Sequence, residues 1–188
     1  MLTLLLACVP ELYSDIDPNL ELNDWSAPEN TWDMGTPPDT LQADGCGEGD
    51  VLNELRGTDQ YGDTVRSWQF YGSCMVIDIG AGWCPPCREL AEHLPSMAAD
   101  HPDVEFLSVL VENVEYQPAQ PEDVAEWAEV FEIEEPVLND PDEWASCAWD
   151  DGLPVVMVIG PDMRVLEDSI EPATPENVER VVGELCGG

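Results

Sequence analysis

Two cysteines separated by two prolines constrain this chain more than any other feature. Cys84 and Cys87 flank Pro85-Pro86. The apolar run at residues 74–80 predicts a buried strand before the pair. After it, apolar residues recur at helical spacing, which predicts a helix over residues 85–99; they are Leu90, Ala91, Leu94, Met97 and Ala98. The cysteine pair is therefore expected on a strand-to-helix turn, where its chemistry suits reversible disulfide exchange.

The start of a helix gives the two cysteines different roles. Unpaired N–H groups and the positive end of the helix dipole favour an anion there, so Cys84 is expected to be the more acidic thiol and the nucleophile. Arg88 follows four residues later on the same helical face and adds a thiolate-stabilising charge. Cys87 turns inward and is expected to resolve the mixed disulfide. Pro85 and Pro86 fit the first helical positions, because their missing N–H groups would have no partner there.

A family resemblance follows from these residues and from two others. Gly82-Trp83-Cys84-Pro85-Pro86-Cys87-Arg88 resembles the active-site motif of the thioredoxin superfamily, in particular the exported bacterial TlpA and ResA type thiol-disulfide oxidoreductases. Asp78 stands six residues before Cys84, where thioredoxins place a buried acid. Gly152-Leu153-Pro154, followed by an apolar strand at residues 155–159, resembles the cis-proline loop of the family. The resemblance covers about residues 47–186.

The resemblance implies an α/β fold, a thioredoxin-like three-layer α/β/α sandwich with a mixed central sheet and an N-terminal β-hairpin extension. Short strands at residues 51–55 and 64–70 fit that hairpin. Further apolar patterns predict a strand at 104–111 and a helix at 121–131. A short helical piece is expected around 142–148, and a last helix at 174–185. This alternation is typical of an α/β sandwich.

The resemblance also assigns site residues. A cis peptide bond before Pro154 would present the backbone of Leu153 to an extended substrate chain, which pairs with it as an added strand. Trp83 would cover the site and, with Pro85 and Pro86, contact the substrate. Asp78 is expected on a strand that is buried on both faces. Desolvation would then raise its pKa and make it a proton acceptor for Cys87 through a water.

Three segments are predicted. Residues 1–8 read as the remnant of a signal peptide, since Leu5-Leu6-Ala7-Cys8 resembles the lipobox of bacterial lipoproteins and would make Cys8 a lipid anchor. The alternative is that Cys8 is an incidental residue. Residues 9–46 are acidic, contain prolines and show little periodicity, which predicts a flexible tether. Residues 47–188 are expected to form the thioredoxin-like domain. No stretch is long and apolar enough to span a bilayer.

Four more cysteines remain. Cys46, Cys74, Cys147 and Cys186 would form two structural disulfides in an exported protein, in any of three pairings. The alternative is that they are buried thiols in a reducing compartment. Cys147 precedes Pro154 by seven residues, which leaves open a place for it near the redox pair.

Charge narrows the partners. Asp and Glu number 41 against 5 basic residues, for a formal net charge of −36. Nucleic acid and anionic membrane surfaces are therefore excluded as expected partners. A solvated acidic surface keeps a protein soluble and opposes thiolate formation at Cys84.

Together these features predict a bacterial envelope enzyme. The chain is expected to be a monomeric thiol-disulfide oxidoreductase that uses no cofactor and holds no metal. It would exchange disulfides with protein thiols as a reductant, would be supplied by an upstream membrane electron donor, and would touch the membrane only through Cys8. Two alternatives remain, a copper or other metal carrier using the same cysteine pair and a peroxiredoxin-like thiol peroxidase.

Overall fold

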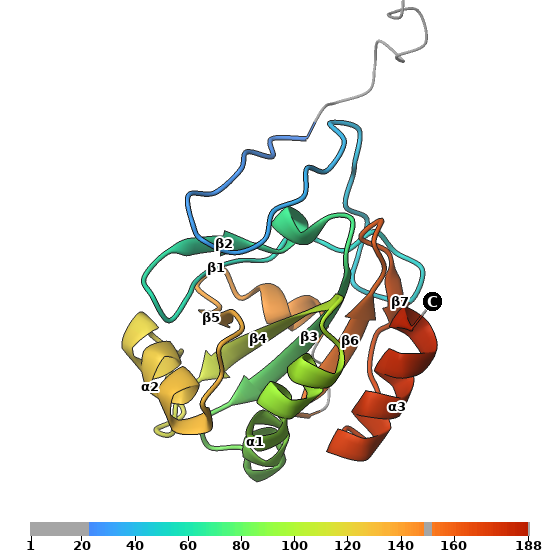
Figure 1. The fold of residues 1–188 in the computed structure, drawn as a ribbon. Coiled ribbons are helices and arrows are strands. Elements are labelled where there is room, and N and C mark those ends of the chain that lie inside the picture. The colour runs from blue at the N-terminus through green and yellow to red at the C-terminus, as the bar shows by residue number, and fades with distance from the viewer. Residues whose placement is uncertain (1–22, 149–151, 188) are drawn as a thin grey trace, which may run out of the picture.

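A mixed five-stranded sheet organises the protein, as seen in a computed structural model that describes residues 23–148 and 152–187 (Figure 1). The strand order is β5-β4-β3-β6-β7, in which β3 is parallel to β4 and antiparallel to β6. The strands are β3 (Cys74–Ala81), β4 (Val104–Glu112), β5 (Val137–Asn139), β6 (Val155–Ile159) and β7 (Val165–Glu167). All eight residues of the central strand β3 are buried, as predicted for a strand covered on both faces.

Three helices cover one face of this sheet. They are α1 (Pro85–Asp100), α2 (Pro121–Phe131) and α3 (Pro175–Cys186). Their apolar residues join alternate residues of the strands, such as Val76 of β3 and Val156 of β6, in one buried cluster. Because the side chains of a strand alternate between faces, Asp78 of β3 and Ser108 of β4 project toward this helical layer.

The other face carries no long helix among the described residues. It is covered by a small sheet of β1 (Arg56–Thr58) and β2 (Thr64–Arg66), by the 3₁₀ helices η1 (Ser67–Phe70) and η2 (Trp144–Cys147), and by the N-terminal segment. Ile77 and Ile79 of β3 and Met157 of β6 are fully buried against this layer. The predicted thioredoxin-like sandwich with an N-terminal hairpin is confirmed, with 3₁₀ helices and loops making much of its second outer layer.

The hairpin differs in detail from the prediction. The first strand is Arg56–Thr58 rather than residues 51–55, and the second ends at Arg66 because Ser67–Phe70 turn into η1. Leu52 and Leu55 are fully buried, so their apolar pattern indicates burial in the core rather than a strand. The prediction also missed β5, since three residues are too short to show a period.

The described part of the predicted tether, residues 23–46, packs against the domain. Trp25, Trp32 and Leu41 contact the core, and the Trp32 indole Nε1 donates a hydrogen bond to Asp59 Oδ2 at 2.7 Å. Arg66 donates to the carbonyl oxygen of Ser26 at 3.1 Å. The many acidic residues and prolines predict flexibility. Trp25, Trp32 and Leu41 nevertheless hold the segment against the core, and they are too widely spaced to form a recognisable period.

Two long-range disulfides close the fold. Cys46 is bonded to Cys147 across 101 residues, and Cys74 is bonded to Cys186 across 112 residues. The first ties the end of the N-terminal segment to η2. The second ties the beginning of β3 to the end of α3. The three pairings that the sequence left open are thus reduced to one.

Candidate active site

Cys84 and Cys87 lie where β3 gives way to α1, as the sequence predicts. Their Sγ atoms form a disulfide that spans three residues. Cys84 is the N-cap of α1, and its sulfur accepts a hydrogen bond from the backbone N–H of Cys87 at 3.3 Å. Pro85 and Pro86 occupy the first helical turn. A thiolate at Cys84 would therefore meet a donor N–H and the positive end of the helix dipole.

Both sulfurs are covered in this oxidised state. Cys84 is 2% exposed and Cys87 is fully buried. Trp83, Val111 and Leu153 pack against the pair. Trp83 thus lies beside the two cysteines, where the sequence analysis expects it. Attack on the disulfide therefore needs part of this covering to move.

Trp83 is held in place by two residues that the sequence did not single out. Its indole Nε1 donates a hydrogen bond to Glu112 Oε2 at 2.7 Å. Its ring stacks on Tyr116 with centroids 5.1 Å apart and planes 15° apart. Tyr116 is itself 63% exposed and has a positive φ of 60°, in a turn that the Asn113 side chain caps by accepting from Gln117 N–H. No sequence period marks these residues, because Glu112 reaches the site through the pairing of β4 with β3 and Tyr116 through the turn that follows β4.

Asp78 lies two residues before Gly80 on the helical face of β3. It is 6% exposed, and burial raises the pKa of Asp78 to about 7. Its Oδ1 atom has no hydrogen-bond partner among the described residues. The same is true of the Ser108 hydroxyl, its register partner on β4. The expected buried carboxyl is therefore present, with a raised pKa whose cause is desolvation.

Gly80 brings Cys87 close to the sheet. A Cβ atom at Gly80 would lie 3.2 Å from Cys87 Cβ and 3.5 Å from Cys87 Sγ. A larger residue would therefore push the resolving cysteine off β3. Because a strand rises about 3.3 Å per residue, Asp78 is about 7 Å from Gly80 along the same face. A glycine inside an apolar strand is the signal that could have identified this close approach.

The loop before β6 lines the site from the other side. The Leu153–Pro154 peptide bond is cis, as the resemblance implied. Leu153 and Pro154 border a cleft of about 650 Å³ that also contacts Pro86. The Cys46–Cys147 disulfide and Pro172, which follows a second cis peptide bond, line the same cleft. Cys147 thus lies near the redox pair, and it is exposed to solvent.

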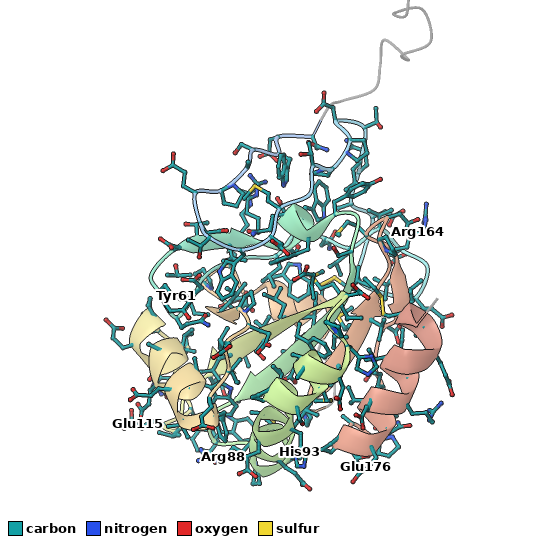
Figure 2. The ribbon with its side chains drawn as sticks, viewed as in Figure 1. Tyr61, Arg88, His93, Glu115, Arg164 and Glu176 are labelled. Carbon is teal, nitrogen blue, oxygen red and sulfur yellow. A yellow bond between two sulfur atoms is a disulfide. The ribbon has the colours of Figure 1, made fainter. Side chains whose placement is uncertain are left out.

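Arg88 lies at the beginning of α1 on the side of α2 (Figure 2). Its Nη1 donates to the carbonyl oxygen of Gly82 at 3.3 Å, and its guanidinium carbon lies 5.5 Å from the centroid of the Phe131 ring. These contacts hold the positive charge next to the residue that precedes Trp83. Stabilisation of the Cys84 thiolate by Arg88 stays a prediction, as do the substrate contacts assigned to Pro85 and Pro86.

The described residues contain no cluster of three or more His, Cys, Asp or Glu side chains arranged to hold a metal ion. None of the helices within residues 23–148 and 152–187 combines the length and apolarity needed to cross a membrane. Cys8, the predicted lipid anchor, lies outside the described residues.

Comparison with known proteins places the chain in a family. Residues 49–167, more than half of the chain, match the AhpC/TSA family. Thioredoxin H8 of Arabidopsis thaliana is 30% identical over 59 residues, 31% of this chain, and the match spans only 40% of that relative's length.

Solved structures share the fold at low identity. A thioredoxin domain of a Bacteroides vulgatus thiol-disulfide oxidoreductase has a TM-score of 0.64 at 14% identity, covering 74% of this chain and 98% of its own. A secreted Mycobacterium tuberculosis disulfide oxidoreductase, described as homologous to DsbE of E. coli, has a TM-score of 0.58 at 19% identity, covering 70% and 96%. Peroxidoxin BcpB of the same organism has a TM-score of 0.59 at 20% identity, and the match covers 73% of this chain and 94% of that structure. The chain has the thioredoxin fold and belongs to the AhpC/TSA family.

Proposed function

We propose that this protein is a thiol-disulfide oxidoreductase that reduces disulfides of protein partners through Cys84 and Cys87. The observation that carries the proposal is the position of Cys84, which caps α1 while bonded to Cys87 and accepts the Cys87 N–H. A cysteine at a helix N-terminus forms a stable thiolate, which is the attacking species in disulfide exchange. The fold shared with disulfide oxidoreductases supports the same assignment.

The proposed reaction has two displacements. In the reduced protein the Cys84 thiolate attacks a partner disulfide, and one partner sulfur leaves with the electron pair of that bond. Cys87 then loses its proton to Asp78 and attacks Cys84 Sγ, which expels the second partner sulfur as a thiolate. The partner gains two electrons and the Cys84–Cys87 disulfide forms. An upstream electron donor at the membrane would return the pair to the dithiol.

Substrate contact is assigned to the cleft beside the redox pair. Leu153 borders both the sulfurs and this cleft, so an extended partner segment lying there would reach Leu153 and Cys84 together. Backbone pairing with Leu153 would recognise a polypeptide without demanding one sequence. Trp83, which also packs against the cysteine pair, would turn aside as the segment reaches Cys84.

The setting is the bacterial cell envelope in this proposal, with the protein monomeric and anchored by a lipid on Cys8. The lipobox-like Leu5-Leu6-Ala7-Cys8 supports the anchor. The two long-range disulfides support an oxidising compartment, because such bonds persist outside the cytosol. Mass spectrometry of the protein isolated from envelopes tests this. Failure to find a diacylglyceryl cysteine at Cys8 would remove the anchor and leave the redox assignment standing.

The redox assignment is tested by the reduction potential of the pair. The full chain is equilibrated in glutathione and dithiothreitol buffers, free thiols are trapped, and each cysteine is quantified by peptide mapping. A reversible couple at Cys84 and Cys87 near the −270 mV of thioredoxin indicates a reductant, whereas one near about −120 mV indicates an oxidant. Cys84→Ser is the control and should lose the couple. If both proteins behave alike, the oxidoreductase assignment fails.

A thiol peroxidase is the second candidate, favoured by the match to the AhpC/TSA family and by the likeness to Peroxidoxin BcpB. In that reaction Cys84 would attack the peroxide bond and become a sulfenic acid, which Cys87 would condense to the disulfide. The rates of oxidation of the reduced chain by hydrogen peroxide and by a protein disulfide, compared at equal concentration, separate the two. Faster oxidation by the protein disulfide supports the oxidoreductase.

A further inference from the structure

Two buried polar groups beneath the redox helix lack hydrogen-bond partners among the described residues, and they are neighbours in the register of β3 and β4. Asp78 Oδ1 and Ser108 Oγ have no hydrogen-bond partner among the described residues. Asp78 is 6% exposed and Ser108 is 4% exposed. Buried polar groups are almost always hydrogen-bonded, to protein or to an internal water. A pair of unsatisfied groups at one place therefore points to a common partner.

The sheet register fixes the relation between the two groups. Asp78 and Ser108 are Cα partners in the parallel pairing of β3 with β4. Register partners project from the same face, and neighbouring strands lie about 4.8 Å apart. On the opposite neighbour, β6, the register partner of Asp78 is Val156, which is fully buried. Asp78 thus has a hydroxyl on one side and an apolar side chain on the other.

The same face leads to the resolving cysteine. Gly80 follows Asp78 on this face, and its missing side chain admits Cys87, whose Sγ would lie 3.5 Å from a Cβ there. Apart from Cys87, the buried residues of α1, α2 and α3 are apolar, among them Leu90, Leu94 and Val178. Desolvation is the cause of the raised pKa of Asp78.

We propose that Ser108 is a positioning residue for the proposed redox reaction, and that its hydroxyl and Asp78 hold one water between them beneath Cys87. This inference rests on the proposed function. The water accepts the Cys87 proton as it passes one of its own to the Asp78 carboxylate. The Cys87 sulfur, left with its electron pair, attacks Cys84 Sγ, and the partner thiolate leaves. Ser108 neither gains nor loses a proton; its hydroxyl holds the water in the orientation in which the water donates to the ionised carboxylate.

The first test measures the titration of Asp78 and does not depend on redox activity. The carboxyl carbon of Asp78 is followed by NMR against pH in the oxidised full chain and in Ser108→Ala. Loss of the water-mediated hydrogen bond to the charged carboxylate should move the inflection to higher pH by about one unit. Ser108→Thr keeps the hydroxyl and should titrate like the wild type. Val156→Ala is the matched control, because it removes packing beside Asp78 and leaves the hydroxyl.

An unchanged inflection in Ser108→Ala, or an equal upward shift in Val156→Ala, would overturn the proposal. The second test measures the pH dependence of the resolving step, from the rate at which a mixed disulfide at Cys84 decays. Ser108→Ala should shift the pH profile of this decay to higher pH, by the same amount as it shifts the inflection of Asp78. In an Asp78→Asn background the same substitution should have no effect on the profile, since Ser108 acts through Asp78.

The two tests separate this proposal from the proposed function. If the wild type forms no mixed disulfide but Asp78 still titrates as expected with Ser108, the water site stands and the oxidoreductase assignment fails. If disulfide exchange proceeds normally and the Asp78 inflection is the same in Ser108→Ala as in the wild type, the oxidoreductase assignment stands and Ser108 has no positioning role.

Discussion

Strand β3 has a disulfide at each end, and the two bonds sit in opposite electrostatic surroundings. Cys84, just beyond the end of the strand, caps the N-terminus of α1 and is bonded to Cys87 three residues away. Cys74 begins the strand and is bonded to Cys186, the last residue of α3. The positive end of a helix dipole favours a thiolate, and the negative end opposes it. The same chemical bond is therefore suited to exchange at one end and to permanence at the other.

Loop length separates the two bonds further. Cross-linking stabilises mainly by restricting the unfolded chain, and the effect grows with the number of residues enclosed. Cys74–Cys186 encloses 112 residues, whereas Cys84–Cys87 encloses almost none. Reducing the first costs fold stability, and reducing the second leaves the fold in place. Repeated turnover at Cys84 and Cys87 is possible for this reason.

The largest expected effect is on stability at the far end of β3. Replacing Cys74 and Cys186 together by serine should lower the free energy of unfolding by about 5 kcal/mol, from the entropy of the opened loop. The reduction potential of Cys84 and Cys87 should stay as in the wild type. Denaturant titration of the oxidised proteins gives the first quantity and thiol trapping the second. A changed reduction potential of Cys84 and Cys87 would mean that the two ends of β3 are coupled, and it would contradict the contrast drawn between the two disulfides.

Asp78 should make the stability of the fold depend on pH. Its folded pKa of about 7 lies above the unfolded value of 3.8, so the folded state holds the proton more tightly. Stability is then greatest below pH 4 and is lost as the pH rises to about 7. Asp78→Asn should be free of this loss and exceed the wild type by up to about 4 kcal/mol at pH 8.

The measurement for Asp78 is denaturant unfolding of both oxidised proteins at pH 5 and at pH 8. The advantage of Asp78→Asn should grow between these two values. An advantage that is the same at both would show that Asp78 does not titrate there, and that its part in proton transfer needs another group.

The redox contrast itself should appear as an order of reduction. In buffers of increasing reducing strength, Cys84 and Cys87 should become thiols before Cys74 and Cys186, with midpoints at least about 30 mV apart. Peptide mapping after thiol trapping assigns each pair. Coincident midpoints would contradict the different roles given to the two helix ends. The exposed Cys147 in the cleft should place the Cys46–Cys147 bond between the other two.

The smallest effect concerns access to the redox pair. Tyr116→Ala removes the ring stacked on Trp83 and should speed reduction of the buried Cys84–Cys87 disulfide by dithiothreitol about fivefold, since such a contact is worth about 1 kcal/mol. Tyr61→Ala is the matched control. Tyr61 is 65% exposed and contacts Trp32, and Figure 2 shows it well above Arg88. Equal rates in both variants would show that Trp83 does not limit access.

Much of this site could be read from the chain because its signals are local. A cysteine pair at the start of a helical pattern predicts the strand-to-helix turn, and the buried run before it predicts a central strand with Asp78 inside. Both depend on spacing within about ten residues, which secondary structure turns directly into geometry. The cis-proline loop at Pro154 was expected only from the family resemblance.

Other parts of the site depend on which strands meet. Ser108 and Glu112 become neighbours of Asp78 and Trp83 only through the pairing of β4 with β3. Tyr116 reaches Trp83 only through the turn that follows β4. The pairing of Cys46 with Cys147 brings a disulfide to the cleft across 101 residues. Such contacts have no spacing in the chain that would reveal them.

The sequence by itself determined the redox pair, its place at a helix start and the thioredoxin-like order of elements, because hydrophobic periods and cysteine spacing act locally. Tertiary structure alone decided the disulfide pairing, the packing of residues 23–46 and the covering of Cys84 by Trp83. The physical reason is that burial and contact are properties of surfaces that come together from distant parts of the chain. Their energies depend on the partner that each surface finds.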